Sequence, residues 1–452
     1  MADRAPARQL WGKETSLALH NFPVSGRPLS IEVVHALAAI KAEAAVVNLA
    51  LGVPGITADI SASIAVAAGD VEEGEHDDQF LIDIFQTGSG TSSNMNVNEV
   101  VAALASDATG SVVHPNDHVN AGQSSNDAFP TAVAMAALRG IVRSLIPAAG
   151  QLAASLASAG ARFSPVVKSG RTHLMDAVPV TLGAEFGGYA AQVREGIDRL
   201  ADCLPRLGRV PLGGTAVGSG LNAHPQFGER VVARLATRWD IPLAVAPDRY
   251  AAQAARDSLV EASGQLRALA MALIKIANDI RLMASGPSAG LGEIRLPELQ
   301  AGSSIMPGKV NPVMCEMITQ VAVQVFGNDA AVAFAGSQGA FELNTYQPVM
   351  AANLLDSVNL LSAGCVLFAE KCVDGLEADA ERCRQLAEAS PSIATALNAA
   401  LGYDRVSKLV KRAVAERRSI IDVVVEEGDL DRETAERLVD VDAMARGTNP
   451  DR

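Results

Sequence analysis

The chain has 452 residues, of which 49% are hydrophobic, 19% charged and only 4% aromatic, and this apolar fraction excludes an intrinsically disordered protein. Because aromatic residues are so few, the core must be built from Ala, Val, Leu and Ile, which favours closely packed helices. With 37 Lys and Arg against 51 Asp and Glu, the formal charge is −14, so the chain is a poor general partner for nucleic acid or an anionic membrane and would bind a small anion only in a locally positive pocket.

The N-terminus, MADRAPARQLWG, has no apolar signal core, and no run of 18 apolar residues occurs, so neither secretion nor a membrane span is expected. The 5 cysteines form no CxxC pair. They are typical of buried free thiols in a reducing compartment, which predicts a cytoplasmic protein without a zinc site or a disulfide framework.

The residue pattern divides the chain into three expected domains. Residues 1–125, the N-terminal domain, are broken by Gly and Pro, with short helical stretches such as 31–51 between the breaks. Residues 126–378 carry long helical patterns and form the central bundle. Residues 379–452 are a charged mix of shorter helices and form a small C-terminal domain. The sequence therefore predicts an all-α fold.

The clearest long helix is predicted for 250–284, where apolar residues recur at alternating steps of three and four. Similar stripes predict helices over 354–372 and 313–333. In the second of these, polar Gln324 and Asn328 share the apolar face and indicate a contact between subunits. Further helices are predicted over 128–158 and 180–204.

Two polar segments precede the long helices. Residues 86–96, QTGSGTSSNMN, are small and hydroxyl-rich, as in an anion cradle, although a plain turn with helix caps explains them equally well. Residues 114–118, HPNDH, and 123–127, QSSND, bring two histidines and two aspartates close together. Their spacing fits no standard zinc motif, so polar contacts around a small anion are favoured over a metal.

Two further segments carry groups suited to acid–base chemistry. In 169–176, SGRTHLMD, His173 lies just before a predicted helix and could transfer a proton, although a lone histidine is more often structural. The linker 286–308 holds five glycines and three prolines, and a loop of this length is more often functional than idle. It ends in 302–312, GSSIMPGKVNP, whose glycines, hydroxyls, ammonium and carboxamide suit a carboxylate. A flexible polar loop is the alternative.

At this point a family resemblance is clear. GSSIMPGKVNP resembles the signature loop of the fumarase/aspartase superfamily, and QTGSGTSSNMNVNEV, VHPNDHVN, QSSNDAFPTA and SGRTHLMDAVPVTLG resemble segments of class II fumarate hydratases. The likeness extends from about residue 10 to about residue 445. His173 stands in GRTH where aspartases carry Gln, which favours a hydratase over an amine lyase.

The resemblance implies an all-α homotetramer in which three subunits build each active site, without metal or cofactor. It implies a cytoplasmic hydro-lyase of the tricarboxylic acid cycle, which interconverts fumarate and (S)-malate through a carbanion with an aci-carboxylate. Its partner would be a small dicarboxylate, not nucleic acid or a membrane. Ser303 would be the base, and Lys309 would bind the substrate carboxylate. His173, oriented by Glu316, would act on the water side.

Other roles also follow from the resemblance alone. The implied substrate-binding residues are Ser89, Gly90, Thr91, Ser124, Ser125, Asn126, Thr172, Ser304, Val310 and Asn311. A second, peripheral anion site is implied at His114, Pro115, Asn116 and Asp117.

Some positions depart from the family pattern, and other functions stay open. Leu17 replaces a usual Arg, Gly122 and Ala184 replace other common residues, and Ser111 stands where some relatives have an Arg that serves the second anion site. The runner-up function is a superfamily lyase that eliminates an amine or another group from a substituted succinate to give fumarate. A non-catalytic scaffold is the third reading, and the complete set of catalytic residues speaks against it.

Overall fold

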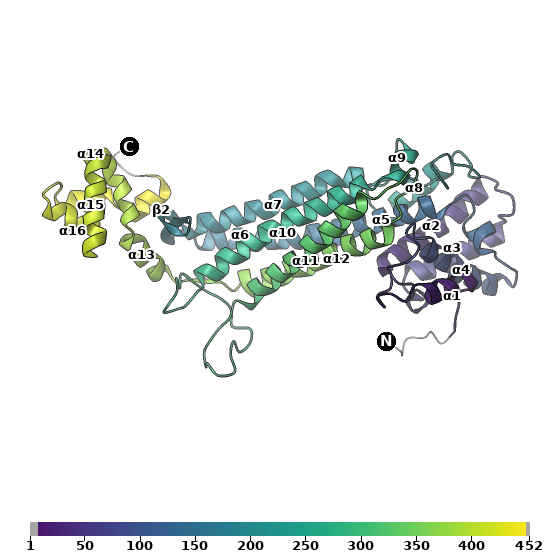
Figure 1. The fold of residues 1–452 in the computed structure, drawn as a ribbon, viewed down its shortest axis with the longest axis horizontal. Coiled ribbons are helices and arrows are strands. Elements are labelled where there is room, and N and C mark those ends of the chain that lie inside the picture. Colours follow the sequence, from purple (N-terminus) through teal and green to yellow (C-terminus); the bar gives the residue numbers. More distant parts are fainter. Residues whose placement is uncertain (1–7, 449–452) are drawn as a thin grey trace. The chain divides into compact units, whose positions relative to one another are not determined.

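The computed structural model describes residues 8–448 and is all-α with a few short strands (Figure 1). The helices are α1 (Lys13–Asn21), α2 (Ile31–Ala50), α3 (Ala58–Glu72), α4 (Thr91–Thr109), α5 (Ser125–Gly140), α6 (Ile146–Arg162), α7 (Leu182–Leu207), α8 (Phe227–Trp239), α9 (Arg249–Ala254), α10 (Asp257–Met283), α11 (Val313–Gly336), α12 (Gln347–Phe368), α13 (Ala380–Ala389), α14 (Asn398–Leu401), α15 (Tyr403–Glu416), α16 (Ile420–Glu426), α17 (Arg432–Leu438) and α18 (Val441–Arg446). Shorter helical turns are η1 (Asp77–Gln79), η2 (Pro115–Val119), η3 (Ile141–Leu145), η4 (Ala369–Val373) and η5 (Pro391–Leu397). Two-stranded pairs join β1 (Val167–Thr172) to β2 (Met175–Thr181), β3 (Arg209–Val210) to β4 (Ala244–Val245) and β5 (Ile294–Arg295) to β6 (Glu377–Ala378).

The chain forms two compact units. The first comprises residues 8–148, 196–271 and 321–363, and the second comprises 149–195, 272–320 and 364–448. The chain passes between the units inside α6, α7, α10, α11 and α12. The division at 125 and 378 rests on the sequence pattern and stays a prediction.

In the first unit, α2 packs against α3, α4, α5 and α8. It is rich in alanine, and all but a few of its side chains are buried, as expected for a helix surrounded by others. The predicted 259–283 and 354–372 stripes are confirmed as core, since the stripe residues Leu259, Ala262, Leu266, Leu269, Leu273, Ile276, Ile280, Met283, Leu354, Val358, Leu361, Cys365, Phe368 and Cys372 are all buried.

One of the two polar residues predicted on the apolar face of α11 bonds to another helix of the same chain. Asn328 is buried, and its Nδ2 donates to Asp356 Oδ2 at 2.9 Å and to Ser357 Oγ at 3.1 Å on α12. The polarity of Asn328 therefore serves a contact between two helices of one chain, while Gln324 is exposed and its predicted contact with another subunit stays a prediction.

The single helix predicted over 250–284 is in fact two helices, α9 and α10. Ala255 is extended, with φ −110° and ψ 163°. The buried guanidinium of Arg256 donates to the carbonyl oxygens of Ala255 at 2.9 Å and Gln253 at 3.0 Å. These bonds satisfy carbonyls that a helix end leaves free, and so they stabilise the break.

Three helical stretches, Ile31–Ala50, Ser125–Arg162 and Gln347–Val373, are long and apolar enough in composition to span a membrane. More than half of the apolar window in each is buried inside the protein. Core packing therefore accounts for part of their hydropathy.

The second unit contains the β1–β2 hairpin and a cluster of short C-terminal helices. Its α6 and α7 approach closely at glycines: a Cβ on Gly183 would lie 2.4 Å from the Gly160 carbonyl oxygen. The C-terminal helices share an apolar core of aliphatic residues that includes Leu409, Val423 and Leu438.

Candidate active site

His173 lies at the tip of a hairpin. Strands β1 and β2 are antiparallel, and Thr172 pairs with Met175, so His173 and Leu174 form a two-residue turn. Their φ angles are 56° and 60°, in the left-handed region that costs energy for residues other than Gly, Asn and Asp. The prediction that this segment directly precedes a helix is wrong, because β2 intervenes before α7. The turn leaves the imidazole exposed.

A buried cluster of charges lies under this hairpin. Arg171 donates from Nη1 and Nη2 to the two carboxylate oxygens of Glu293, at 3.0 and 2.7 Å. Lys168 Nζ lies 2.9 Å from Glu185 Oε2 and 3.3 Å from Glu293 Oε2. Burial opposes the charge on Arg171, but the bonds and charge of Glu293 raise the pKa of its guanidinium. The cluster fixes the hairpin to the first part of the 286–308 loop, and sequence reasoning missed it.

The 286–308 loop is packed against its own unit at Glu293 and at β5, which pairs with β6, and a later part of it extends away from the helices of that unit (Figure 1). Two hydrogen bonds close its last part: Gly302 N donates to Lys309 O at 3.1 Å, and Asn311 Nδ2 donates to Gly302 O at 2.8 Å. Only glycine fits at 302, because a Cβ there would lie 2.1 Å from Lys309 O.

Inside this closed turn, the Oγ of Ser303 accepts backbone N–H groups from Ile305 at 3.2 Å and from Met306 at 3.1 Å. Hydrogen bonds donated to an oxygen favour its ionised form. Ser303 is half-buried, while the other predicted loop residues Ser304, Lys309 and Val310 are exposed. Glu316 is exposed in the first turn of α11.

In the first unit, three of the predicted hydroxyls form a continuous row. Ser89 Oγ lies 2.7 Å from Thr91 Oγ1, which lies 2.6 Å from Ser125 Oγ. Thr91 begins α4 and Ser125 begins α5, so the row lies where helix N–H groups and dipoles favour an anion. Gly90 allows the approach of these elements, since a Cβ there would lie 2.2 Å from the ring of Phe129.

The residues beside this row are held by caps. Ser124 caps α5: its Oγ accepts from Asn126 N at 3.2 Å, and its N–H donates to Asp127 Oδ1 at 2.8 Å. Asn126 Nδ2 donates to the carbonyl oxygen of Ala216 at 2.9 Å. The 86–96 and 123–127 segments therefore meet, as the anion-cradle reading requires.

The predicted second anion site forms the start of η2. The Nδ1 of His114 accepts backbone N–H groups from Asn116 at 3.3 Å and Asp117 at 3.1 Å. Pro115 opens the turn. The same ring nitrogen lies 3.3 Å from Asp117 Oδ2, and the second anion site stays a prediction.

Metal-ligand geometry occurs elsewhere. Between residues 8 and 448, one group of three potential ligands has its ligand atoms within 4.8 Å of one another: Asp70 in the last turns of α3, and Glu75 and His76 in the segment that follows it. The histidines of 114–118 belong to no such group in that part of the chain.

The predicted residues thus fall into two groups, one in each unit. Ser89, Thr91, Ser124, Ser125 and Asn126 are in the first unit, and Thr172, His173, Ser303, Lys309, Asn311 and Glu316 are in the second. In the described part of the chain, no hydrogen bond or ion pair joins His173 to Glu316.

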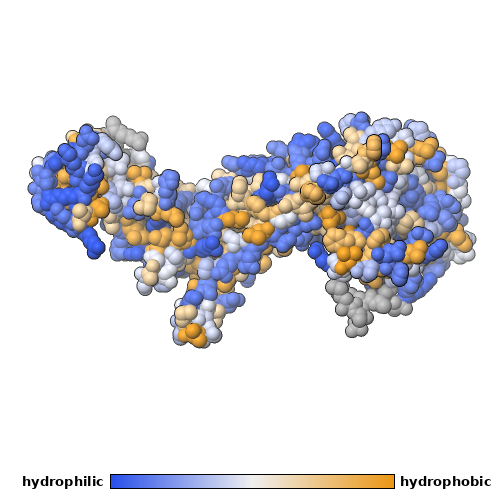
Figure 2. Space-filling model, viewed as in Figure 1, coloured by the Kyte–Doolittle hydropathy of each residue, from blue (hydrophilic) through white to orange (hydrophobic). Residues whose placement is uncertain are grey.

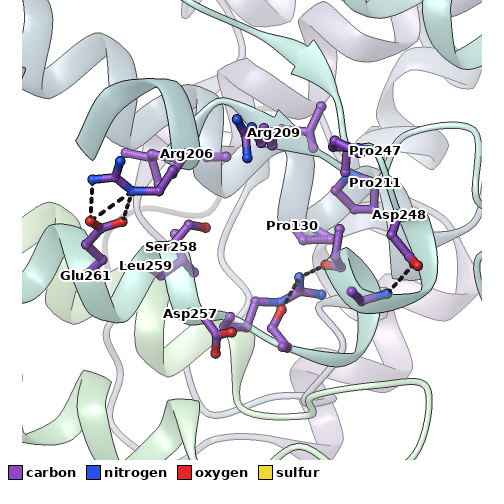
Figure 3. A pocket seen from close by; sticks show the side chains of 18 residues that line it. Pro130, Arg206, Arg209, Pro211, Pro247, Asp248, Asp257, Ser258, Leu259 and Glu261 are labelled. Atoms are coloured by element: carbon purple, nitrogen blue, oxygen red, sulfur yellow. Dashed lines mark hydrogen bonds and ion pairs between the residues drawn. The ribbon is translucent and has the colours of Figure 1, made fainter. Parts of the chain in front are cut away.

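A further cavity in the first unit is lined by none of these residues. It has a volume of about 650 Å³ and lies in the first unit between the end of α7, β3 and the start of α10 (Figure 3). Arg206 on its wall pairs with Glu261, and Asp248 caps α9 by accepting from Ala251 N at 2.9 Å. Arg206, Glu261 and Asp248 on its wall are thus engaged by partners within the chain.

Comparison with known proteins gives concordant results. A family described as "Lyase" matches residues 3–327, and one described as "Fumarase C C-terminus" matches residues 393–446. The "Fumarate hydratase class II" of Mycobacterium tuberculosis (strain CDC 1551 / Oshkosh) is 54% identical over 453 residues, which cover 99% of this chain and 95% of that relative. The protein of the same description from Corynebacterium glutamicum is 54% identical over 448 residues, covering 98% and 94%. The crystal structure of recombinant class II fumarase from Schistosoma mansoni superposes with a TM-score of 0.95 at 37% identity, over 98% of this chain and 97% of that one.

Proposed function

The chain belongs to the class II fumarate hydratases, and from this premise we propose that its two groups of candidate residues form one active site when subunits assemble. The chain is a hydro-lyase that hydrates fumarate reversibly to (S)-malate, and both substrates are dicarboxylates. The division of the candidate residues between the two units supports the proposal, because neither group alone offers both a proton acceptor and enough donors for two carboxylates.

The single observation that carries the mechanism is the environment of Ser303. A serine hydroxyl is too weak an acid to serve as a base near neutral pH unless its surroundings favour the alkoxide. Two backbone N–H groups already point at the Oγ of Ser303. With Lys309 in the same turn, the oxygen would take the C3 proton of malate, leaving a carbanion.

That carbanion needs donors at the carboxylate onto which its charge spreads. The existing carboxylate charge opposes a second one, so donors fixed in advance are worth more than mobile ones. Lys309 and the remaining N–H of Asn311 Nδ2 supply them in this proposal, since the other N–H is used on Gly302 O. The second carboxylate would lie on the row of Ser89, Thr91 and Ser125.

His173 would act on the hydroxyl group that leaves malate as water. Its position at a strained hairpin tip supports this role, because left-handed backbone in non-glycine residues is often retained at functional sites. We propose that Glu316 of another subunit, rather than of the same chain, orients the imidazole.

A homotetramer is part of the proposal. The exposed face of α11 carries an apolar stripe, which we define as Val323, Phe326, Ala330 and Phe334. The side chains of Val323 and Phe334 are 67% and 68% exposed. Figure 2 shows apolar patches on the helical surface in this view. Apolar side chains at helical spacing on a long helix favour packing against another subunit.

A cytoplasmic location and the absence of a cofactor also remain proposals. The location is supported by Cys203, Cys315, Cys365, Cys372 and Cys383, which are all free and buried, as in a reducing compartment.

The test is the ultraviolet absorbance of fumarate after purified protein is mixed with malate in the presence of a chelator. We expect absorbance to rise with malate and to stay flat with aspartate. Absorbance that rises with aspartate or another substituted succinate, but not with malate, would instead support the alternative lyase. Loss of activity with the chelator would contradict the cofactor-free mechanism.

A further inference from the structure

The structure holds a lysine ammonium at full burial between the motif segments of the first unit. Lys41, in α2, is inaccessible to solvent. Its Nζ donates to Asn94 Oδ1 at 2.8 Å, to Asn120 Oδ1 at 2.9 Å and to Gln123 Oε1 at 2.9 Å. An ammonium has three N–H groups, so the three amide oxygens satisfy it completely.

These amides belong to the segments that carry the candidate substrate residues. Asn94 lies one helical turn after Thr91 in α4, and Gln123 directly precedes Ser124. Lys41 therefore joins the start of α4 to the start of α5. The contact between Thr91 and Ser125 lies between the same two helix starts.

A buried carboxylate, Asp127, completes the arrangement from the other side. Besides the Ser124 N–H, it accepts N–H groups from Gly213 at 2.9 Å and from Thr215 at 2.8 Å. It thereby fixes the 213–215 turn against the start of α5. Lys41 and Asp127 attract each other across the cluster.

Packing alone does not require a charge at position 41. Its sequence neighbours in α2 are Ile40 and Ala42, and an aliphatic side chain would avoid the cost of removing an ammonium from water, but it would leave the three amide oxygens without this donor. What a charge adds is geometry, because a satisfied ammonium fixes three amides in direction as well as distance.

We propose that Lys41 is a positioning residue for substrate binding, which holds Thr91 and Ser125 at the separation that binds one carboxylate. This inference rests on the proposed function, in which the row of hydroxyls binds the substrate. Lys41 does not touch the substrate itself.

The test compares Lys41→Met with Ser61→Ala, which removes a buried hydrogen bond between α3 and α2 at Ala45 O and touches no motif segment. We expect Lys41→Met to raise the KM for malate about 10- to 100-fold, the loss expected when hydrogen bonds to a charged group are misplaced. Because such contacts act before and during the reaction, kcat should change much less. Ser61→Ala should lower the melting temperature and leave KM unchanged.

An unchanged KM in folded Lys41→Met would overturn the proposal and leave the lysine a purely structural role. If Lys41→Met does not fold, Gln123→Met tests the proposal instead, because it keeps the ammonium and removes the contact that the ammonium makes beside Ser124. A raised KM for malate in Gln123→Met would support the proposal, and an unchanged KM would overturn it. Thr91→Val separates the premise from the inference. An unchanged KM in Thr91→Val would remove the hydroxyl row from the site and so overturn both, whereas a raised KM there with none in Lys41→Met would overturn the positioning role alone.

Discussion

The Oγ of Ser303 is the atom on which the proposed chemistry depends, and its two backbone donors come from residues two and three positions later in the chain. This geometry is local, so it should survive changes elsewhere. Ser303→Ala should lower kcat by about 10²- to 10⁴-fold, which is the range for loss of a general base. Because the contacts of Ser303 are local, the melting temperature should not change. Ser288→Ala, an exposed serine in the same loop, is the control and should keep full activity. A loss below tenfold in Ser303→Ala would place the base elsewhere.

His173 offers a clean substitution because of its backbone. Asn tolerates a φ of 56° better than most residues, so His173→Asn removes the imidazole without disturbing the turn. We expect kcat to fall by about 10²-fold while the thermal melt stays the same. Leu174→Gly, which relieves the strain beside it, should raise the melting temperature slightly. Full activity in His173→Asn would exclude the proposed role.

The buried pair Lys41 and Asp127 predicts a particular pH dependence of stability. Burial, partly opposed by Asp127, lowers the pKa of Lys41 from 10.5 to about 7. Between those values the unfolded chain binds more protons than the folded one, so the free energy of unfolding rises with pH. Burial raises the pKa of Asp127 from 3.8 to about 6, so between those values stability falls as pH rises. Together they predict a minimum between pH 6 and 7.

Denaturant unfolding of the parent protein and of Lys41→Met from pH 7 to 9 measures how much Lys41 contributes to the pH dependence of stability. The parent should gain up to about 1.4 kcal/mol per pH unit relative to the variant. Parallel curves would show that Lys41 keeps its ordinary pKa.

At the scale of elements, the apolar stripes predicted the long helices correctly, because a period of three and four residues reports burial directly. The hairpin at 167–181 was missed, since its turn is His-Leu rather than the Asn-Gly that signals such turns. The break before Arg256 was also missed, because the apolar stripe starts only at Leu259 and gives no information on the residues before it. A helix break that a single guanidinium stabilises does not change the hydropathy pattern of the sequence.

In the candidate site, too, the sequence pattern predicted some residues and missed others. Loops such as 302–312 could be found because glycines and hydroxyls gather in sequence. Lys41 could not, because its partners Asn94, Asn120 and Gln123 are distant in sequence, and a lone lysine in a helix ordinarily reads as solvated. Glu293 was missed for the same reason.

The link between the hairpin and the 286–308 loop predicts a local instability. Glu293→Gln leaves the buried cations Lys168 and Arg171 without their shared carboxylate, which costs about 3–5 kcal/mol in such sites. We expect faster amide hydrogen exchange over 167–181 and a lower kcat. Arg295→Gln, which breaks an exposed pair with Asp379, should change stability by less than about 1 kcal/mol. Equal exchange in both variants would contradict the link.

For the whole molecule, the apolar stripe on α11 makes assembly testable. Phe334→Glu places a charge on a face proposed to pack against another subunit, so the tetramer should dissociate. Because the proposed site needs several subunits, activity should be lost with it. Light scattering measures the mass. Val66→Glu, a similarly exposed position on α3, should leave mass and activity unchanged. A variant Phe334→Glu of unchanged mass would move the interface away from α11.

The chain crosses between its two units five times, and this has a consequence for how such proteins evolve. Each passage lies inside a helix, so no loop marks the boundary where a gene could be cut and rejoined. Exchange of one unit for its counterpart would require five simultaneous joins in mid-helix. Recombination is therefore a poor route to new activities in this architecture, and descent by point substitution in loops such as 86–96 and 302–312 is the accessible one.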